Sequence, residues 1–174
     1  MAMKIGSLDI ERGVLLAPME DVSDSPFRRI CRRFGADIVY TEFISSDGLV
    51  RNAPRSFQKL RIEPDEHPIA VQIFGGHIPT MVEAARVAIE SNPDFLDINC
   101  GCWVKNVVAR NAGAALLKDP PLMAAMARVG GSCSRSGYGQ NASRLGSLFD
   151  RDLRCRPYAR GCWYCCIGNP LPHA

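Results

Sequence analysis

The sequence has no long apolar segment. Its 174 residues contain no apolar run of about 18 or more, the length that a membrane-spanning helix needs. The opening residues Met1–Lys4 are not followed by the apolar stretch of a secretory signal. We therefore predict a cytoplasmic protein that does not associate with membranes, and we expect no stable protein partner.

Cysteine is scarce in most of the chain. Only Cys31, Cys100 and Cys102 precede residue 130, while the other five of the eight cysteines lie in residues 130–174. Without an export signal, these cysteines are expected to be reduced thiols, metal ligands or a nucleophile. Residues 1–129 also lack an excess of one charge, with 15 Lys+Arg against 16 Asp+Glu. The front segment therefore has no basic surplus that would by itself indicate nucleic-acid binding.

The glycine fingerprint that opens a dinucleotide-binding sheet is also absent. What the front segment does contain is a regular alternation of strand-like and helix-like patterns. Strands are predicted at 14–17, 37–42, 69–74 and 95–99, and helices at 27–34, 79–91 and 116–129. This alternation indicates parallel βα units, which occur in doubly wound sheets and in (β/α)8 barrels.

The positions of the polar residues favour the barrel. Barrel enzymes build their active sites at the carboxyl ends of the strands. Residues at or just beyond those ends are Pro18, Met19, Glu42, Gln72, Asn99 and Cys102. Because a full barrel needs at least about 200 residues, we predict that residues 1–129 form the N-terminal half of a (β/α)8 TIM barrel, an α/β fold. We expect residues 130–174 to be an irregular, unstructured tail.

The segment after the fourth predicted strand is the richest in reactive groups. Cys102 follows Gly101 in a tight turn, and Lys105 comes three residues later. A nearby positive charge stabilises a thiolate, so Cys102 is a candidate proton donor. The alternative is that Cys100 and Cys102 are small buried residues that pack a loop.

Five groups of residues resemble the landmarks of one enzyme family. They are Leu15 to Met19 with Asp21 to Arg28, Tyr40 to Glu42, Val71 to Gly75, Asp97 to Cys102, and Gly113 to Leu117. They occur in order and at compatible spacing across nearly all of residues 4–129. In this respect the front segment resembles the tRNA-dihydrouridine synthases.

The resemblance implies a barrel that binds FMN, takes hydride from NADPH and reduces the C5–C6 double bond of a uridine in tRNA. It implies that Cys102 protonates the uracil from the face opposite the flavin, and that Asn99 orients the uracil. Lys105 matches a basic position expected near the RNA. The residues expected to line the flavin are Ala17, Pro18, Met19 and Gln72.

Two residues depart from the family pattern, and several roles have simpler alternatives. Trp103 replaces the proline that normally follows the cysteine, so its indole is expected to displace the loop or fill part of the uracil pocket. Cys100 replaces a larger apolar residue. In the simpler interpretations, Gln72 satisfies backbone groups at a strand end, Lys105 is a solvated loop charge and Glu42 only braces the barrel.

Two other classes of protein remain open. Another FMN-dependent barrel oxidoreductase, such as a dihydroorotate dehydrogenase relative, would act on a small molecule, although the motif from Asn99 to Lys105 argues against it. A non-catalytic RNA-binding fragment would gain little electrostatic attraction from the nearly neutral front segment. Because the predicted front segment supplies only four of eight strands, we expect this polypeptide to be inactive and, with an unpaired strand edge, prone to aggregation.

After Val129 the resemblance stops. The family pattern would continue with Val-Lys-Thr-Arg-Leu-Gly-Trp-Asp and, later, a strand ending in His-x-Arg-Thr. Codons for residues 139–147, read one base later, permit the first motif. The same shift over residues 160–173 permits Glu-Asp-Val-Gly-Ile-Ala-Ala-Leu-Ala-Ile-His-Cys-Arg-Thr. We therefore predict that residues 130–174 are read out of frame, after one inserted base or two lost bases near the codons for residues 129–132.

The cysteines of the tail allow a second interpretation. Cys162 and Cys165 have the separation of zinc ligands, so a zinc knuckle that also uses Cys155, Cys166 and His173 is the alternative. No matching pair precedes them at the usual spacing. Codons rich in Gly, Val and Ala readily give cysteine when read out of phase, so we predict no bound metal.

Overall fold

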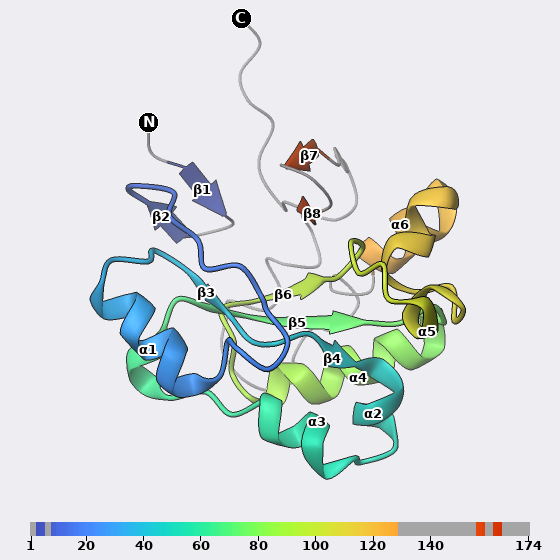
Figure 1. Cartoon of the computed structure of the whole chain (residues 1–174), viewed down its shortest axis with the longest axis horizontal. Coiled ribbons are helices and arrows are strands. Elements are labelled where there is room, and N and C mark those ends of the chain that lie inside the picture. The colour runs from blue at the N-terminus through green and yellow to red at the C-terminus, as the bar shows by residue number, and fades with distance from the viewer. Residues whose placement is uncertain (1–2, 6–7, 129–155, 159–161, 165–174) are drawn as a thin grey trace, which may run out of the picture.

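The computed structural model describes residues 3–5, 8–128, 156–158 and 162–164, and its centre is a parallel sheet (Figure 1). β5 (Ile69–Phe74) lies in the middle of this sheet, and β6 (Phe95–Ile98) pairs with one of its edges. β3 (Val39–Tyr40) and β4 (Ile44–Ser45) both pair with the other edge. β3 and β4 are therefore two pieces of one strand that is interrupted at residues 41–43.

The order of the strands follows the order of the chain. A parallel bridge between Leu15 and Ile38 places the first strand segment beside β3. The sheet then continues through β3 with β4, β5 and β6, each parallel to its neighbour. Adjacent parallel strands in chain order are the arrangement of a (β/α)8 barrel.

Helices connect the strands, and several of them lie along one side of the sheet (Figure 1). The α-helices are α1 (Ser25–Arg33), α2 (Ser46–Val50), α3 (Pro54–Lys59), α4 (Ile78–Glu90), α5 (Lys105–Val108) and α6 (Pro120–Ala127). The 3-10 helices are η1 (Pro64–Glu66) and η2 (Gly113–Lys118).

Two of these helices show how the sequence determines the fold. Asp24 caps α1, because its side chain accepts a hydrogen bond from the backbone of Phe27 at 3.0 Å. Gly35 follows α1 with a φ of +96°, in the left-handed region that favours glycine. In α4 the buried residues, Met81, Ala84, Ala85 and Ala88, recur at helical spacing. They pack against Val71 and Ile73 of β5.

The packing of side chains distinguishes a barrel from a doubly wound sheet. Cys31 of α1 packs with Val39 and Ile69, which belong to the same alternating face as Val71 and Ile73. The helices α1 and α4 therefore cover one face, whereas a doubly wound sheet carries helices on both. The prediction of an N-terminal half-barrel is confirmed for the described residues.

The opposite face of the sheet is covered by a hairpin at the amino-terminal ends of the strands. The antiparallel hairpin of β1 (Met3–Ile5) and β2 (Leu8–Ile10) lies on the side of the sheet away from α2, α3 and α4 (Figure 1). Ile10 packs there with Ile38, Tyr40 and Ala70. The hairpin thus closes the amino-terminal end of the face that would be the barrel interior.

Several predicted boundaries differ from the structure. The helix predicted at 116–129 is wrong as one element, since η2 ends at Lys118 and α6 starts at Pro120. Proline cannot continue a helix but fits a first turn, and Asp119 caps the new helix. The strand predicted at 14–17 is reduced to a single bridge, and the short helices α2 and α3 were not predicted.

Within residues 130–174 the structure describes only two short strands. β7 (Arg156–Tyr158) and β8 (Cys162–Tyr164) form an antiparallel pair. The remainder of the predicted unstructured tail, including Cys155, Cys165, Cys166 and His173, lies outside the described residues.

No helix in the part of the chain that the structure describes has both the length and the apolar character needed to cross a lipid bilayer.

Candidate active site

Polar side chains gather at the carboxyl ends of β5 and β6. Gln72 stands directly opposite Asp97 in the parallel register, and Asn99 follows two residues after Asp97. Because side chains alternate along a strand, all three belong to the face that the helices leave uncovered. The sheet therefore presents a carboxylate and two amides on what would be the inner wall of a barrel.

These three side chains form a hydrogen-bonded chain that ends at the turn bearing Cys102. Gln72 Nε2 donates to Asp97 Oδ2 at 2.5 Å, and Asn99 Nδ2 donates to Gln72 Oε1 at 3.0 Å. Asn99 Oδ1 then accepts hydrogen bonds from the backbone nitrogens of Gly101, at 3.1 Å, and Cys102, at 2.9 Å. The structure thus brings together the predicted site residues Gln72, Asn99 and Cys102.

Among the residues that the structure describes, Asp97 is the titratable group whose pKa is most strongly altered. Burial raises the pKa of Asp97 to about 6, from the ordinary 3.8, while the hydrogen bond from Gln72 opposes the rise. The residue is still partly accessible to solvent, so its carboxylate lies at the margin of the interior. It is largely ionised at neutral pH and acts there as a hydrogen-bond acceptor only.

Backbone contacts also fix the turn that carries Cys102. The carbonyl oxygen of Cys102 accepts a hydrogen bond from the nitrogen of Ala114 at 2.9 Å. Gly113 has a φ of +59°, and a Cβ atom there would lie 2.5 Å from the same carbonyl oxygen. Only glycine allows this approach. Cys102 itself is a free thiol of intermediate exposure.

The loop with the predicted flavin-lining residues Ala17, Pro18 and Met19 follows the first strand segment. Ser23 Oγ accepts a hydrogen bond from the backbone nitrogen of Met19 and donates one to its carbonyl oxygen, both at 2.9 Å. The buried Arg28 donates to the carbonyl oxygen of Ser23 at 2.8 Å. Arg28 also forms a buried ion pair with Glu66 at 3.0 Å. A buried, paired arginine thus supports this loop from beneath.

Three carboxylates, from Glu20, Asp21 and Glu42, lie beside the loop, with oxygens within 4.8 Å of one another. Lys59 forms an ion pair with Glu20 and lies 4.0 Å from Glu42, and Arg55 pairs with Asp21 at 3.0 Å. The backbone nitrogen of Asp21 also donates to Glu42. These contacts fasten the loop to the second strand, so Glu42 has the contacts of a brace.

The other residues singled out in the sequence lie apart from this hydrogen-bonded chain. Cys100 is buried in the core beneath the helices. Trp103 is 81% exposed, so its indole does not fill a pocket within the described residues. Lys105 is the exposed first residue of α5.

Sequence reasoning assigned no role to Asp97, Ser23 or Arg28. A signal existed for Asp97, because a charged residue within the apolar strand Phe95–Ile98 needs a buried partner. No comparable signal marked Arg28, since its partner Glu66 is distant in the sequence.

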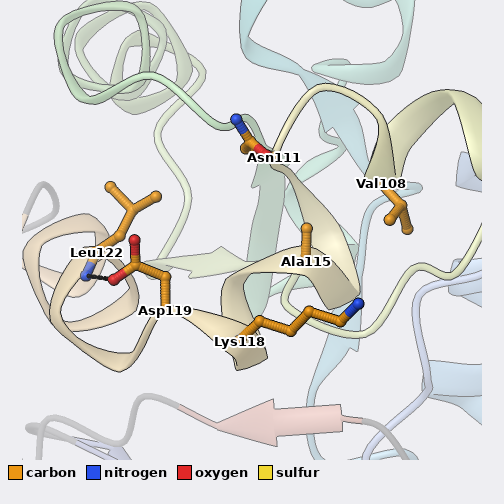
Figure 2. A pocket seen from close by; sticks show the side chains of 6 residues that line it. All are labelled: Val108, Asn111, Ala115, Lys118, Asp119 and Leu122. Atoms are coloured by element: carbon orange, nitrogen blue, oxygen red, sulfur yellow. Dashed lines mark hydrogen bonds between the residues drawn. The ribbon is translucent and has the colours of Figure 1, made fainter.

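A shallow hollow lies elsewhere, at the junction of α5, η2 and α6 (Figure 2). Its lining residues are Val108, Asn111, Ala115, Lys118, Asp119 and Leu122. Figure 2 shows Asp119 turned toward Leu122, whose backbone nitrogen it caps at 3.0 Å, with Lys118 extending away from it. None of these residues belongs to the predicted site.

Comparison with known proteins identifies the family. The model of the family described as Dihydrouridine synthase (Dus) matches residues 15–129. The chain is 41% identical over 122 residues to tRNA-dihydrouridine synthase B of Pseudomonas syringae pv. tomato, an alignment that covers 70% of this chain and 36% of that protein. It is 44% identical over 111 residues to a probable tRNA-dihydrouridine synthase of Aquifex aeolicus, covering 63% of this chain and 35% of the relative. The chain thus spans about a third of the length of these curated relatives. Since the family model matches more than half of the sequence, this chain belongs to the dihydrouridine synthase family.

Proposed function

We propose that this chain carries the N-terminal part of a cytoplasmic flavoenzyme that reduces the C5–C6 double bond of a uridine in tRNA, using FMN and NADPH. The observation that supports it best is the hydrogen-bonded set Gln72, Asn99 and Cys102 at the ends of adjacent strands, in a chain of this family. The resemblance assigns these three residues to flavin binding, uracil orientation and proton donation.

The residues present fit one side of a flavin ring. Each amide nitrogen of Gln72 and Asn99 has a second hydrogen, and no bond from it is seen to any side chain that the structure describes. Flavin and uracil rings both present carbonyl oxygens and ring nitrogens to such donors. In this proposal Gln72 and the loop Ala17–Met19 hold the flavin, which supplies the hydride when bound.

The remaining chemistry falls to the turn. Asn99 orients the uracil through its free amide hydrogen, and Cys102 Sγ–H gives its proton to the ring carbon that does not receive hydride. Lys105, exposed at the start of α5, lies near the RNA backbone in this proposal. A uridine must leave its base stack to reach such a site, at a cost of a few kcal/mol.

The test compares two proteins: the 174-residue chain, and a chain whose codons after residue 129 are returned to the other reading frame. Each is purified and assayed for FMN absorbance and for NADPH-dependent dihydrouridine in unmodified tRNA. We expect activity only in the restored chain, with a loss of at least about a hundredfold in Cys102→Ala. Reduction of a small-molecule substrate without tRNA modification would instead support the dihydroorotate dehydrogenase-like alternative. Salt-dependent tRNA binding without flavin would support the RNA-binding alternative.

We also propose that residues 130–174 are encoded out of frame. Two observations support this: the family match ends at residue 129, and the possible codons, shifted by one base, permit two family motifs. Sequencing of genomic DNA and transcript across the codons for residues 125–145 tests it. One extra base, or two missing, relative to an uninterrupted frame is the expected result. One-to-one zinc binding that protects the tail from protease would support the zinc-knuckle alternative.

A further inference from the structure

The hydrogen-bonded chain from Asp97 to Cys102 has a fixed direction. At one end stands a carboxylate, which accepts hydrogen bonds but does not donate them when ionised. At the other end stand the backbone N–H groups of Gly101 and Cys102, which only donate. Between them lie two amides, Gln72 and Asn99, and each of these can present either its oxygen or its nitrogen to a neighbour.

These two ends leave one arrangement for the amides. Gln72 must turn its nitrogen to Asp97, and therefore its oxygen to Asn99. Asn99 must then turn its nitrogen to Gln72 and its oxygen to the two backbone nitrogens. If either amide were reversed, two donors or two acceptors would face each other, and buried polar groups would lose their partners.

We propose that Asp97 is a positioning residue for the active-site turn, acting through Gln72 and Asn99 to hold the backbone of Gly101 and Cys102. Its carboxylate sets the direction of both amides. This direction keeps the Cys102 turn closed around Asn99 Oδ1, and it points the free amide hydrogens of Gln72 and Asn99 to the uncovered face. Asp97 reaches the turn through Gln72 and Asn99, so its contribution is geometric.

A purely structural role for Asp97 fits less well. The flanking strand pairs, Val71 with Leu96 and Ile73 with Ile98, are apolar and belong to the other face, so the strands can pair without a carboxylate at position 97. A partly buried carboxylate lowers stability when it is ionised, so its presence needs a compensating function. Fixing the two amides is the function that its contacts provide.

This inference rests on the proposed function for the meaning of Cys102, but its geometry can be tested without flavin or tRNA. Backbone hydrogen exchange at Gly101 and Cys102 is measured residue by residue in the purified 174-residue chain and in its variants. In Asp97→Leu the carboxylate acceptor is lost. We expect the backbone N–H groups of Gly101 and Cys102 to exchange about tenfold faster, which corresponds to the loss of one ordinary hydrogen bond. Asp97→Asn keeps an acceptor oxygen, so we expect it to restore most of the protection.

A double-mutant cycle shows whether the effect passes through Gln72. Gln72→Leu is expected to speed exchange at the same two amides, and Asp97→Leu is expected to add nothing in that background. The matched control is Asp37→Leu, because Asp37 also accepts a backbone hydrogen bond, from Val14 at 2.9 Å, yet has no path to the turn. Exchange at the amides of β5 reports whether each variant remains folded.

The outcomes are separable. Unchanged exchange at Gly101 and Cys102 in folded Asp97→Leu, an equal rise in Asp37→Leu, or additive effects with Gln72→Leu would each overturn the inference. If Asp97→Leu does not fold, Asp97→Asn and Gln72→Leu are compared instead. The inference is then overturned if exchange at Gly101 and Cys102 in Asp97→Asn is no closer to the wild-type rates than exchange in Gln72→Leu. A restored chain that shows these exchange effects of Asp97 and yet makes no dihydrouridine would refute the proposed function but not the positioning role of Asp97.

Discussion

The two faces of β5 and β6 are built from the same strands but have opposite chemistry. On the helix-covered face, Val71 and Ile73 of β5 pack with Met81 and its neighbours in α4. On the uncovered face, Gln72 and Asp97 form a polar pair at the same level of the sheet. Two adjacent residues, Gln72 and Ile73, therefore serve different purposes.

This difference shows where stability and chemistry are located. Burial of apolar side chains against α4 stabilises the sheet, whereas the uncovered face holds a carboxylate that burial makes costly to ionise. Substitutions on the two faces should consequently change stability in opposite directions. Four substitutions test this comparison, in order of decreasing effect.

The largest loss is expected on the helix-covered face. Ile73 is 1% exposed, and Ile73→Ala leaves a cavity between β5 and α4. We expect the free energy of unfolding to fall by roughly 2–5 kcal/mol, measured by urea denaturation followed by circular dichroism. The control is Val104→Ala, at an exposed position, where a loss of comparable size would show that the comparison is wrong.

Asp97→Asn on the uncovered face should instead stabilise the fold at neutral pH. The pKa of Asp97 is about 6 in the folded chain, above its ordinary 3.8, so the folded state binds the proton more tightly. The wild type therefore loses stability as pH rises from about 4 to about 6 and remains at that lower level at pH 7. We expect the variant to be more stable at pH 7 by roughly 1–3 kcal/mol and to lose this advantage below about pH 4.

Asp37 provides a control of opposite sign for that experiment. The hydrogen bond from the backbone of Val14 lowers the pKa of Asp37, so its ionised form is favoured by folding. Asp37→Asn should therefore decrease stability at pH 7. If both asparagine variants shift stability in the same direction, ionisation of Asp97 is not the cause.

A smaller effect is expected in the loop that borders the uncovered face. Ser23→Ala removes the hydroxyl that bonds both backbone groups of Met19. We expect a loss of about 1 kcal/mol in urea denaturation, with faster proteolysis between residues 17 and 23. Ser91→Ala, which removes a hydroxyl that donates only to the carbonyl oxygen of Ala88, should leave the proteolysis of that loop unchanged.

The smallest effect is expected at Trp103. Its side chain is 81% exposed and belongs to neither face of the sheet. Trp103→Ala should change the free energy of unfolding by no more than about 0.5 kcal/mol. A loss above 1.5 kcal/mol in the same denaturation experiment would mean that the indole packs against the fold in solution.

The sequence was most informative where one residue type repeats with a clear period. A nearly continuous apolar run identified β5, helical spacing identified α4, and strand ends located Gln72 and Asn99. It was least informative where a contact joins distant segments. Arg28 and Glu66 support the Met19 loop, and Asp97 sets the direction of the Gln72 and Asn99 side chains. Both arrangements depend on three-dimensional proximity that no local pattern encodes.

The chain order of the parallel strands has a consequence for synthesis on the ribosome. Each new strand pairs with the one made just before it, and α4 packs on β5 before β6 has to be added. The sheet can therefore grow in the direction of translation without waiting for a distant partner. In such vectorial folding the polar pair Gln72 and Asp97 forms only when the fourth strand arrives, so the active-site turn would be among the last parts of this segment to become ordered.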